Sequence, residues 1–319
     1  TLGGGFGWLS RSYGLTADNL VSADIVTAEG KPVHASATEN EDLFWALRGG
    51  GGNFGVVTMF EYRLHEAGPN LLAGLIVFPG SETRSILGKY REFAAGLPDE
   101  MTVWVVLRKA PPLPFLPEDV HGTDVMVLAF CYNGDPAEGE KLIDPVRGFG
   151  NAHGEHLGAM PFVAWQQAFD PLLTPGERNY WKSHNFTELS DDLFDVTVKY
   201  ATEIPDPQCE IFIAQLGGAI NRVAPDATAY AHRNTQFVIN VHGRWSAAAD
   251  DDRCIGWARA FFDATAGFAN GGVYVNFMTA EESARVPNAF GPNFERLAAI
   301  KARYDPNNLF NQNQNIMPA

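Results

Sequence analysis

The sequence predicts an α+β fold in which a large antiparallel sheet is covered by helices on one face. From residue 71 onward, β-branched and aromatic runs alternate with amphipathic helical runs. Before that point, two glycine-rich runs at residues 1–14 and 48–55 flank a strand pair and a helix. The length of 319 residues suggests two domains or one large domain, and the 45% hydrophobic fraction excludes a disordered chain.

The N-terminal part is predicted to be a small antiparallel unit. Its expected elements are strands at 20–27, 32–35 and 54–64, a turn at 28–31 and a helix at 40–47. Asn40 is expected to cap the helix, and acidic residues follow it in the first turn. A domain boundary is predicted at 67–70, where Gly and Pro interrupt the pattern.

The remainder is predicted to form the large sheet and its helices. The expected strands lie at 72–78, 101–107, 124–132, 210–216, 235–241 and 272–277, and the expected helices start at Ser81, Asp251 and about Asn293. The proline-rich residues 110–117 are expected to form an exposed loop.

Net charge and cysteine spacing narrow the kinds of partner and of covalent structure that we expect. With 23 basic and 38 acidic residues the net charge is −15, which disfavours nucleic acid and anionic membranes as partners. Cys131, Cys209 and Cys254 are widely spaced and are expected to be buried thiols. No signal peptide or membrane-spanning run is visible, which favours a cytoplasmic location and leaves secretion open.

Several common catalytic patterns do not fit the chain. Gly50, Gly52 and Gly55 match G-x-G-x-x-G, but a helix precedes them and a strand follows, which is the reverse of the dinucleotide-binding order. A hydrolase elbow of the G-x-S-x-G type is missing from the sequence. His153 and His156 are three residues apart in an expected loop, so no metal site is predicted.

Residues 1–20, 40–58 and 293–316 closely resemble the FAD-binding domain and closing segment of berberine-bridge-enzyme-like flavin oxidases. These oxidases belong to the vanillyl-alcohol-oxidase group, whose FAD-binding domain is of the PCMH type. The resemblance implies that 1–67 is the second subdomain of that domain, that 68–290 is a substrate domain, and that 291–319 returns to the FAD-binding domain.

The resemblance also implies that this chain lacks a lobe that its relatives have. Members of the family begin with a further lobe, which grips the FAD pyrophosphate and carries the residues that bond covalently to the flavin. We therefore expect this chain to be a fragment whose FAD attachment residues lie outside it. A non-catalytic remnant, with a small-molecule-binding or purely structural domain, is the alternative.

Both glycine runs and the polar tail are expected to hold FAD. Glycine lets the backbone approach a ligand closely, and amide side chains supply hydrogen-bond donors to the flavin ring edge. The expected cofactor-binding residues are Gly4, Gly5, Gly7, Ser10, Asn53, Gly55, Val57, Asn313 and Asn315.

Tyr274 and Asn276 form the predicted catalytic pair. Alternation along the expected strand places both on one face, and such strands line the substrate side of the flavin in the proteins that this sequence resembles. Tyr274 is the candidate base or positioning group. The alternative is an ordinary core tyrosine satisfied by one hydrogen bond.

Two further positions bear on the substrate. Lys182 is a candidate contact in the substrate cavity, and the alternative is a surface lysine lying over Trp181. Phe290 stands where many relatives have tyrosine. The expected reaction oxidises an alcohol or amine carbon of a small molecule such as a sugar, alkaloid or secondary metabolite, with hydride transfer to flavin N5 and molecular oxygen as acceptor.

Overall fold

The computed structural model describes residues 1–312 and 314–319 and divides the chain into two compact units. The first contains residues 1–66, 217–235 and 271–319, and the second contains residues 67–216 and 236–270. Two segments of the predicted substrate domain, 217–235 and 271–290, thus pack in the first unit. They do so because Ala229, Val273 and Phe290 are buried in its core.

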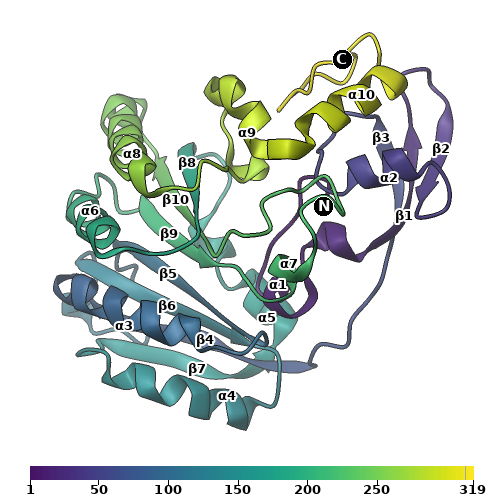
Figure 1. The fold of residues 1–319 in the computed structure, drawn as a ribbon. Coiled ribbons are helices and arrows are strands. Elements are labelled where there is room, and N and C mark those ends of the chain that lie inside the picture. Colours follow the sequence, from purple (N-terminus) through teal and green to yellow (C-terminus); the bar gives the residue numbers. More distant parts are fainter. Residues whose placement is uncertain (313) are drawn as a thin grey trace. The chain divides into compact units, whose positions relative to one another are not determined.

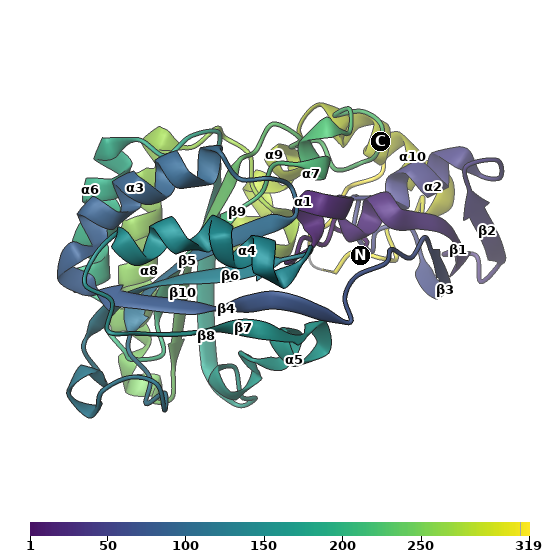
Figure 2. The same ribbon diagram turned by 90° about the horizontal axis from the view of Figure 1, so that it is seen from below.

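The first unit contains a three-stranded antiparallel sheet of order β2-β1-β3 (Figure 2). The strands are β1 (Leu20–Val26), β2 (Pro32–Ser36) and β3 (Val56–Tyr62). Helix α2 (Glu41–Leu47) packs beside α10 (Phe294–Tyr304). The shorter helices of this unit are α1 (Ser10–Tyr13), α7 (Ala219–Arg222) and α9 (Val286–Phe290).

Asn40 precedes α2 but does not cap it, so the predicted capping role is wrong. Its φ of 48° is left-handed, and its side-chain amide donates to the carbonyl oxygen of His34 at 2.7 Å. The amide is therefore used to close the β2–α2 connection instead of satisfying the helix N-terminus.

The second unit contains a seven-stranded antiparallel sheet of order β7-β4-β6-β5-β9-β10-β8 among the described residues (Figure 1). Its strands are β4 (Asn70–Pro79), β5 (Met101–Lys109), β6 (Asp124–Tyr132), β7 (Gly154–Pro161), β8 (Arg178–Phe186), β9 (Glu210–Gln215) and β10 (Phe237–Trp245). The prediction of a loop around His153 and His156 is wrong at His156. This residue lies in β7 and pairs with Leu75 of β4.

Four helices cover one face of this sheet, which confirms the predicted fold class (Figure 1). They are α3 (Thr83–Ala95), α4 (Pro136–Ile143), α6 (Asp191–Thr202) and α8 (Asp251–Thr265), while the short helix α5 (Phe162–Gln167) contacts β4 and β7. Ser81 lies in a 3₁₀ turn before α3 and makes no capping bond, because α3 begins at Thr83.

Residues 110–117 are irregular, as predicted, but they are not wholly exposed. Ala110 and Leu116 are buried and pack with Val77 and Val125 on the sheet. Apolar side chains within a proline-rich segment thus cover part of the sheet without regular structure.

The three cysteines are confirmed as buried free thiols. Burial raises the pKa of the Cys131 and Cys209 thiols to about 12. Across the described ranges, no helix has the length and apolar character needed to cross a bilayer.

Candidate functional site

A cavity of about 560 Å³ in the first unit joins both glycine runs to the C-terminal tail. Gly3 comes from the first run, and Gly51, Gly52 and Asn53 come from the second. Asn276, which is distant from both runs in sequence, also lines the cavity. The tail contributes Leu309, Phe310, Gln312 and Gln314 to the wall. The volume falls within the roughly 300–1,000 Å³ that small-molecule sites occupy.

Glycines, which have no side chain, shape this cavity. A Cβ at Gly3 would lie 2.2 Å from the Asn276 Oδ1, so only glycine allows Asn276 to approach there. At Gly52 a Cβ would meet nothing within 4 Å, so its backbone is open to the cavity. The backbone therefore forms much of the wall, as a close-fitting flat ligand requires.

Asn53 fastens the tail to the second glycine run. Its side-chain amide nitrogen donates to the carbonyl oxygens of Gly50 at 2.9 Å and Gln314 at 3.2 Å. Its Oδ1 accepts from the backbone N–H of Ile316 at 2.9 Å. Ile316 is fully buried, so the tail packs within the first unit. Since the Asn53 side chain is committed to the tail, its predicted contact with FAD stays a prediction.

A fully buried ion pair lies behind the same wall. The Lys301 Nζ is 2.6 Å from the Asp305 Oδ2 and also donates to the carbonyl oxygens of Asn53 and Phe310, both at 2.8 Å. The backbone N–H groups of Leu309 and Phe310 donate to the Asp305 carboxylate. Burial opposes ionisation of Asp305, but these hydrogen bonds outweigh it, so its pKa is lowered. Asp305 is therefore charged.

Tyr274 and Asn276 come together, although the predicted strand at 272–277 is wrong. Residues Val275–Phe277 form a 3₁₀ turn, closed by a bond from the Phe277 N–H to the Tyr274 carbonyl oxygen. The Asn276 amide nonetheless donates to the Tyr274 hydroxyl oxygen at 2.7 Å. The turn thus pairs residues i and i+2, as the strand would have done.

Two backbone groups of the first glycine run also donate to Tyr274. The N–H groups of Gly5 and Phe6 lie 3.0 and 3.4 Å from its hydroxyl oxygen. Burial raises the pKa of Tyr274, while the bonds from Asn276, Gly5 and Phe6 work in the opposite direction by favouring the phenolate. Tyr274 is 4% exposed, and the Phe6 ring packs 4.8 Å from its ring centroid.

Other residues of the first run make contacts within the protein. The N–H of Gly7 donates to the Ser10 Oγ at 2.8 Å, and Gly4 lies against the rings of Tyr230 and Tyr274. Their expected roles toward FAD stay predictions.

Two of the other predicted cofactor residues lie beside β1: Gly55 directly precedes β3, and Val57 lies within it. A Cβ at Gly55, whose φ is +153°, would lie 2.5 Å from the Val26 carbonyl oxygen, so packing on β1 accounts for this glycine. Val57 pairs with Ile25 in the sheet. Of the residues that the structure describes, neither Gly55 nor Val57 lines the cavity.

The remaining predicted residues lie in the tail and in the second unit. Asn315 donates to the Met317 sulfur at 3.3 Å, and Asn313 lies outside the described residues. Lys182 lies on β8 with its Nζ 4.7 Å from the centroid of the Phe262 ring. It is 8% exposed, so the alternative of a surface lysine is wrong, and its predicted substrate contact stays a prediction.

Sequence reasoning missed Lys301, which bonds to the backbone of Asn53 behind the cavity wall, and Tyr230, whose ring lies beside that of Tyr274. Each acts through contacts between distant parts of the chain, and only the Asp305-Pro306 helix stop near Lys301 gave a local signal. In the part of the chain that the structure describes, no group of three or more His, Cys, Asp or Glu side chains is placed to hold a metal ion.

Comparisons with known proteins agree with this arrangement. The family model "Berberine and berberine like" matches residues 273–317. The xylooligosaccharide oxidase of Thermothelomyces thermophilus is 30% identical over 354 residues, covering 100% of this chain and 67% of that protein. An FAD-linked oxidoreductase of Dictyostelium discoideum is 28% identical, with 100% and 67% covered.

Solved structures give the same result. A xylooligosaccharide oxidase from Myceliophthora thermophila C1, in complex with xylobiose, superposes with a TM-score of 0.82 at 28% identity, covering 100% of this chain and 70% of that one. A chitooligosaccharide oxidase gives a TM-score of 0.81 at 26% identity, with the same coverage. Fold and sequence together define an FAD-linked oxidoreductase class. The chain belongs to the berberine-bridge-enzyme-like family of that class, as its sequence predicted.

Proposed function

We propose that this chain supplies a cofactor-binding wall and the catalytic base of an FAD-dependent oxidase that acts on an alcohol carbon of a sugar. One observation carries the proposal: the Tyr274 hydroxyl oxygen receives N–H groups from Gly5, Phe6 and Asn276, and Asn276 also lines the glycine-walled cavity. Its relatives include oxidases of xylo- and chitooligosaccharides, which supports a sugar substrate and oxygen as acceptor.

The cavity fits a flat ring system with a polar edge. Gly3, Gly51 and Gly52 present backbone instead of side chains, and Asn276 and Gln314 add amide groups at the wall. FAD, when bound, supplies the acceptor for the two electrons that leave the substrate carbon. These five residues are the ones that we expect to contact it.

Tyr274 takes the substrate proton. As a sugar hydroxyl loses its proton to the Tyr274 Oη, the negative charge passes from the phenolate to the substrate oxygen and the phenol becomes neutral, while the adjacent carbon would give up its hydride and become a carbonyl carbon. The three N–H donors hold the phenolate before this step, in the way that an oxyanion hole holds developing charge. Asn276 is the donor with the shortest bond, so it orients the base.

Tyr274→Phe tests this assignment in the FAD-loaded protein. We expect the rate of anaerobic flavin reduction by an oligosaccharide to fall about 10²- to 10⁴-fold, the usual contribution of a general base. Tyr304→Phe is the control, because it removes a phenol that bonds to Asp42, away from the cavity wall. A Tyr274→Phe protein that is reduced at the wild-type rate would refute the role of Tyr274.

A further inference from the structure

Tyr230 carries a buried hydroxyl that nothing above uses. The residue is 3% exposed, and within the described ranges no hydrogen-bond partner lies within reach of its hydroxyl oxygen. Burying a hydroxyl without a partner costs stability, and phenylalanine would fill the same space without that cost. The hydroxyl therefore needs an explanation other than packing.

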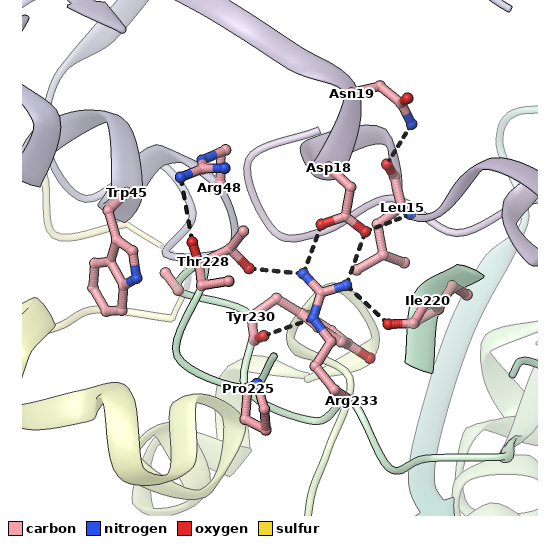
Figure 3. A network of polar contacts seen from close by, with 12 residues as sticks. Leu15, Asp18, Asn19, Trp45, Arg48, Ile220, Pro225, Thr228, Tyr230 and Arg233 are labelled. Carbon is pink, nitrogen blue, oxygen red and sulfur yellow. Dashed lines mark hydrogen bonds and ion pairs between the residues drawn. The ribbon is translucent and has the colours of Figure 1, made fainter. Parts of the chain in front are cut away.

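The backbone of Tyr230 is held firmly in the first unit. Its N–H donates to the Arg48 carbonyl oxygen at 3.2 Å, and its carbonyl oxygen accepts from the Arg233 Nε at 3.2 Å (Figure 3). Arg233 is in turn fixed by a buried ion pair with Asp18, at 2.6 Å (Figure 3). A Cβ at Gly49 would lie 2.2 Å from the Tyr230 nitrogen, so the second glycine run closes directly onto this backbone.

The first glycine run brings the Tyr230 ring beside Tyr274. A Cβ at Gly4 would lie 3.3 Å from the Tyr230 Cδ2 and 3.5 Å from the Tyr274 Cε2. The two ring centroids are 6.4 Å apart in an edge-to-face arrangement. Both glycine runs thus meet at a pair of neighbouring phenols.

The two phenols differ in their hydrogen bonding. The Tyr274 oxygen accepts from three N–H groups, which favours its charged form, whereas the Tyr230 oxygen has no such donor. Burial raises the pKa of Tyr230, and the nearby Tyr274 raises it further, so Tyr230 keeps its proton. Burial raises the pKa of both phenols, but only Tyr274 has N–H donors that oppose the rise, so Tyr274 is the better proton acceptor and Tyr230 the better hydrogen-bond donor.

We propose that Tyr230 is a ligand-binding residue of this site, whose hydroxyl donates a hydrogen bond to an oxygen of the polyhydroxylated substrate that Tyr274 deprotonates. The inference rests on the proposed function and adds a recognition group to it. A substrate with a hydroxyl or carbonyl oxygen at that point satisfies the orphaned donor, and a substrate without one leaves it buried and unpaired.

Tyr230→Phe tests the proposal because it removes only the hydroxyl. In the ligand-free protein we expect the melting temperature to stay the same or to rise, since an unsatisfied polar group is lost. For a sugar substrate we expect KM to rise about ten- to hundredfold, the effect of one lost hydrogen bond to a buried polar partner, with kcat within a few-fold of wild type. The stabilisation by added sugar, measured as a shift in melting temperature, should shrink in parallel.

Tyr90→Phe is the matched control. The Tyr90 hydroxyl is also fully buried, but it donates to the Val103 carbonyl oxygen at 3.0 Å in the core of the second unit. Its loss should lower the melting temperature and leave KM unchanged. A series of deoxy sugars gives a second control, because the one that lacks the recognised oxygen should bind wild type and Tyr230→Phe equally.

The outcomes are separable. If Tyr230→Phe lowers the melting temperature as Tyr90→Phe does and leaves KM and the sugar-induced shift unchanged, or if it fails to fold, the hydroxyl is structural and the inference is overturned. If wild-type protein neither binds nor oxidises any sugar, the proposed function fails instead, and that result is seen without any variant.

Discussion

Lys301→Met should destabilise the first unit strongly, because it breaks a fully buried ion pair. Lys301 and Asp305 both have side chains that are 0% exposed, and the ammonium group satisfies Asn53 and Phe310 as well as Asp305. Removing one partner of a buried pair costs about 3–5 kcal/mol, because the other charge is left uncompensated. Methionine keeps much of the volume of lysine, so the loss reports the charge and its hydrogen bonds.

Equilibrium urea unfolding measures this cost, and Arg303→Met provides the control. Arg303 lies on the same helix and pairs with Asp42, but its side chain is 63% exposed, so its loss should cost less than about 1 kcal/mol. The Asp305 pKa is lowered by folding, so its contribution to stability is present at neutral pH and is lost as pH falls through the lowered folded value. Lys301→Met should weaken that acid dependence. A cost as small as that of Arg303→Met would refute the argument.

Three further results are expected. The three cysteine thiols should resist a thiol reagent in the native protein and react fully in urea, because they are buried and burial raises their pKa. Reaction in the native protein would contradict this and would show that the core of the second unit opens. Gly49→Ala should prevent normal folding of the first unit, because the new Cβ would clash with the Tyr230 nitrogen and the φ of +133° is unfavourable for alanine. Gly52→Ala should fold, with a change in the free energy of unfolding under about 0.5 kcal/mol. Equal melting temperatures for the two variants would contradict this reasoning. Flavin reduction should rise with pH toward the alkaline range, because the pKa of Tyr274 is raised and only its phenolate accepts a proton; a rate that is flat with pH would contradict this.

The elements that the sequence predicted well are those with a clear apolar pattern. β6 matches the expected range of 124–132, and α8 matches 251–265, because packing on one core imposes a clear periodicity. β7 and β8 were not predicted. They carry glycine, histidine, lysine and asparagine at positions that burial or edge pairing supports only in the folded sheet.

The site was only partly predictable, for a related reason. Tyr274 and Asn276 were paired correctly from their spacing, although a 3₁₀ turn brings them together instead of a strand. Tyr230 gave no local signal of its role, and the only local signal near Lys301 was the helix stop at Asp305-Pro306. Lys301 acts through Asn53, which lies 248 residues away in sequence, and Tyr230 acts through contacts with both glycine runs.

The visible absorption spectrum of the purified protein, recorded before and after anaerobic addition of an oligosaccharide, tests the central claim most directly. The account predicts flavin absorption bands that bleach when the sugar is added and return when oxygen is admitted. Bound flavin that no sugar reduces would contradict the claim that this chain forms part of a flavin-dependent sugar oxidase.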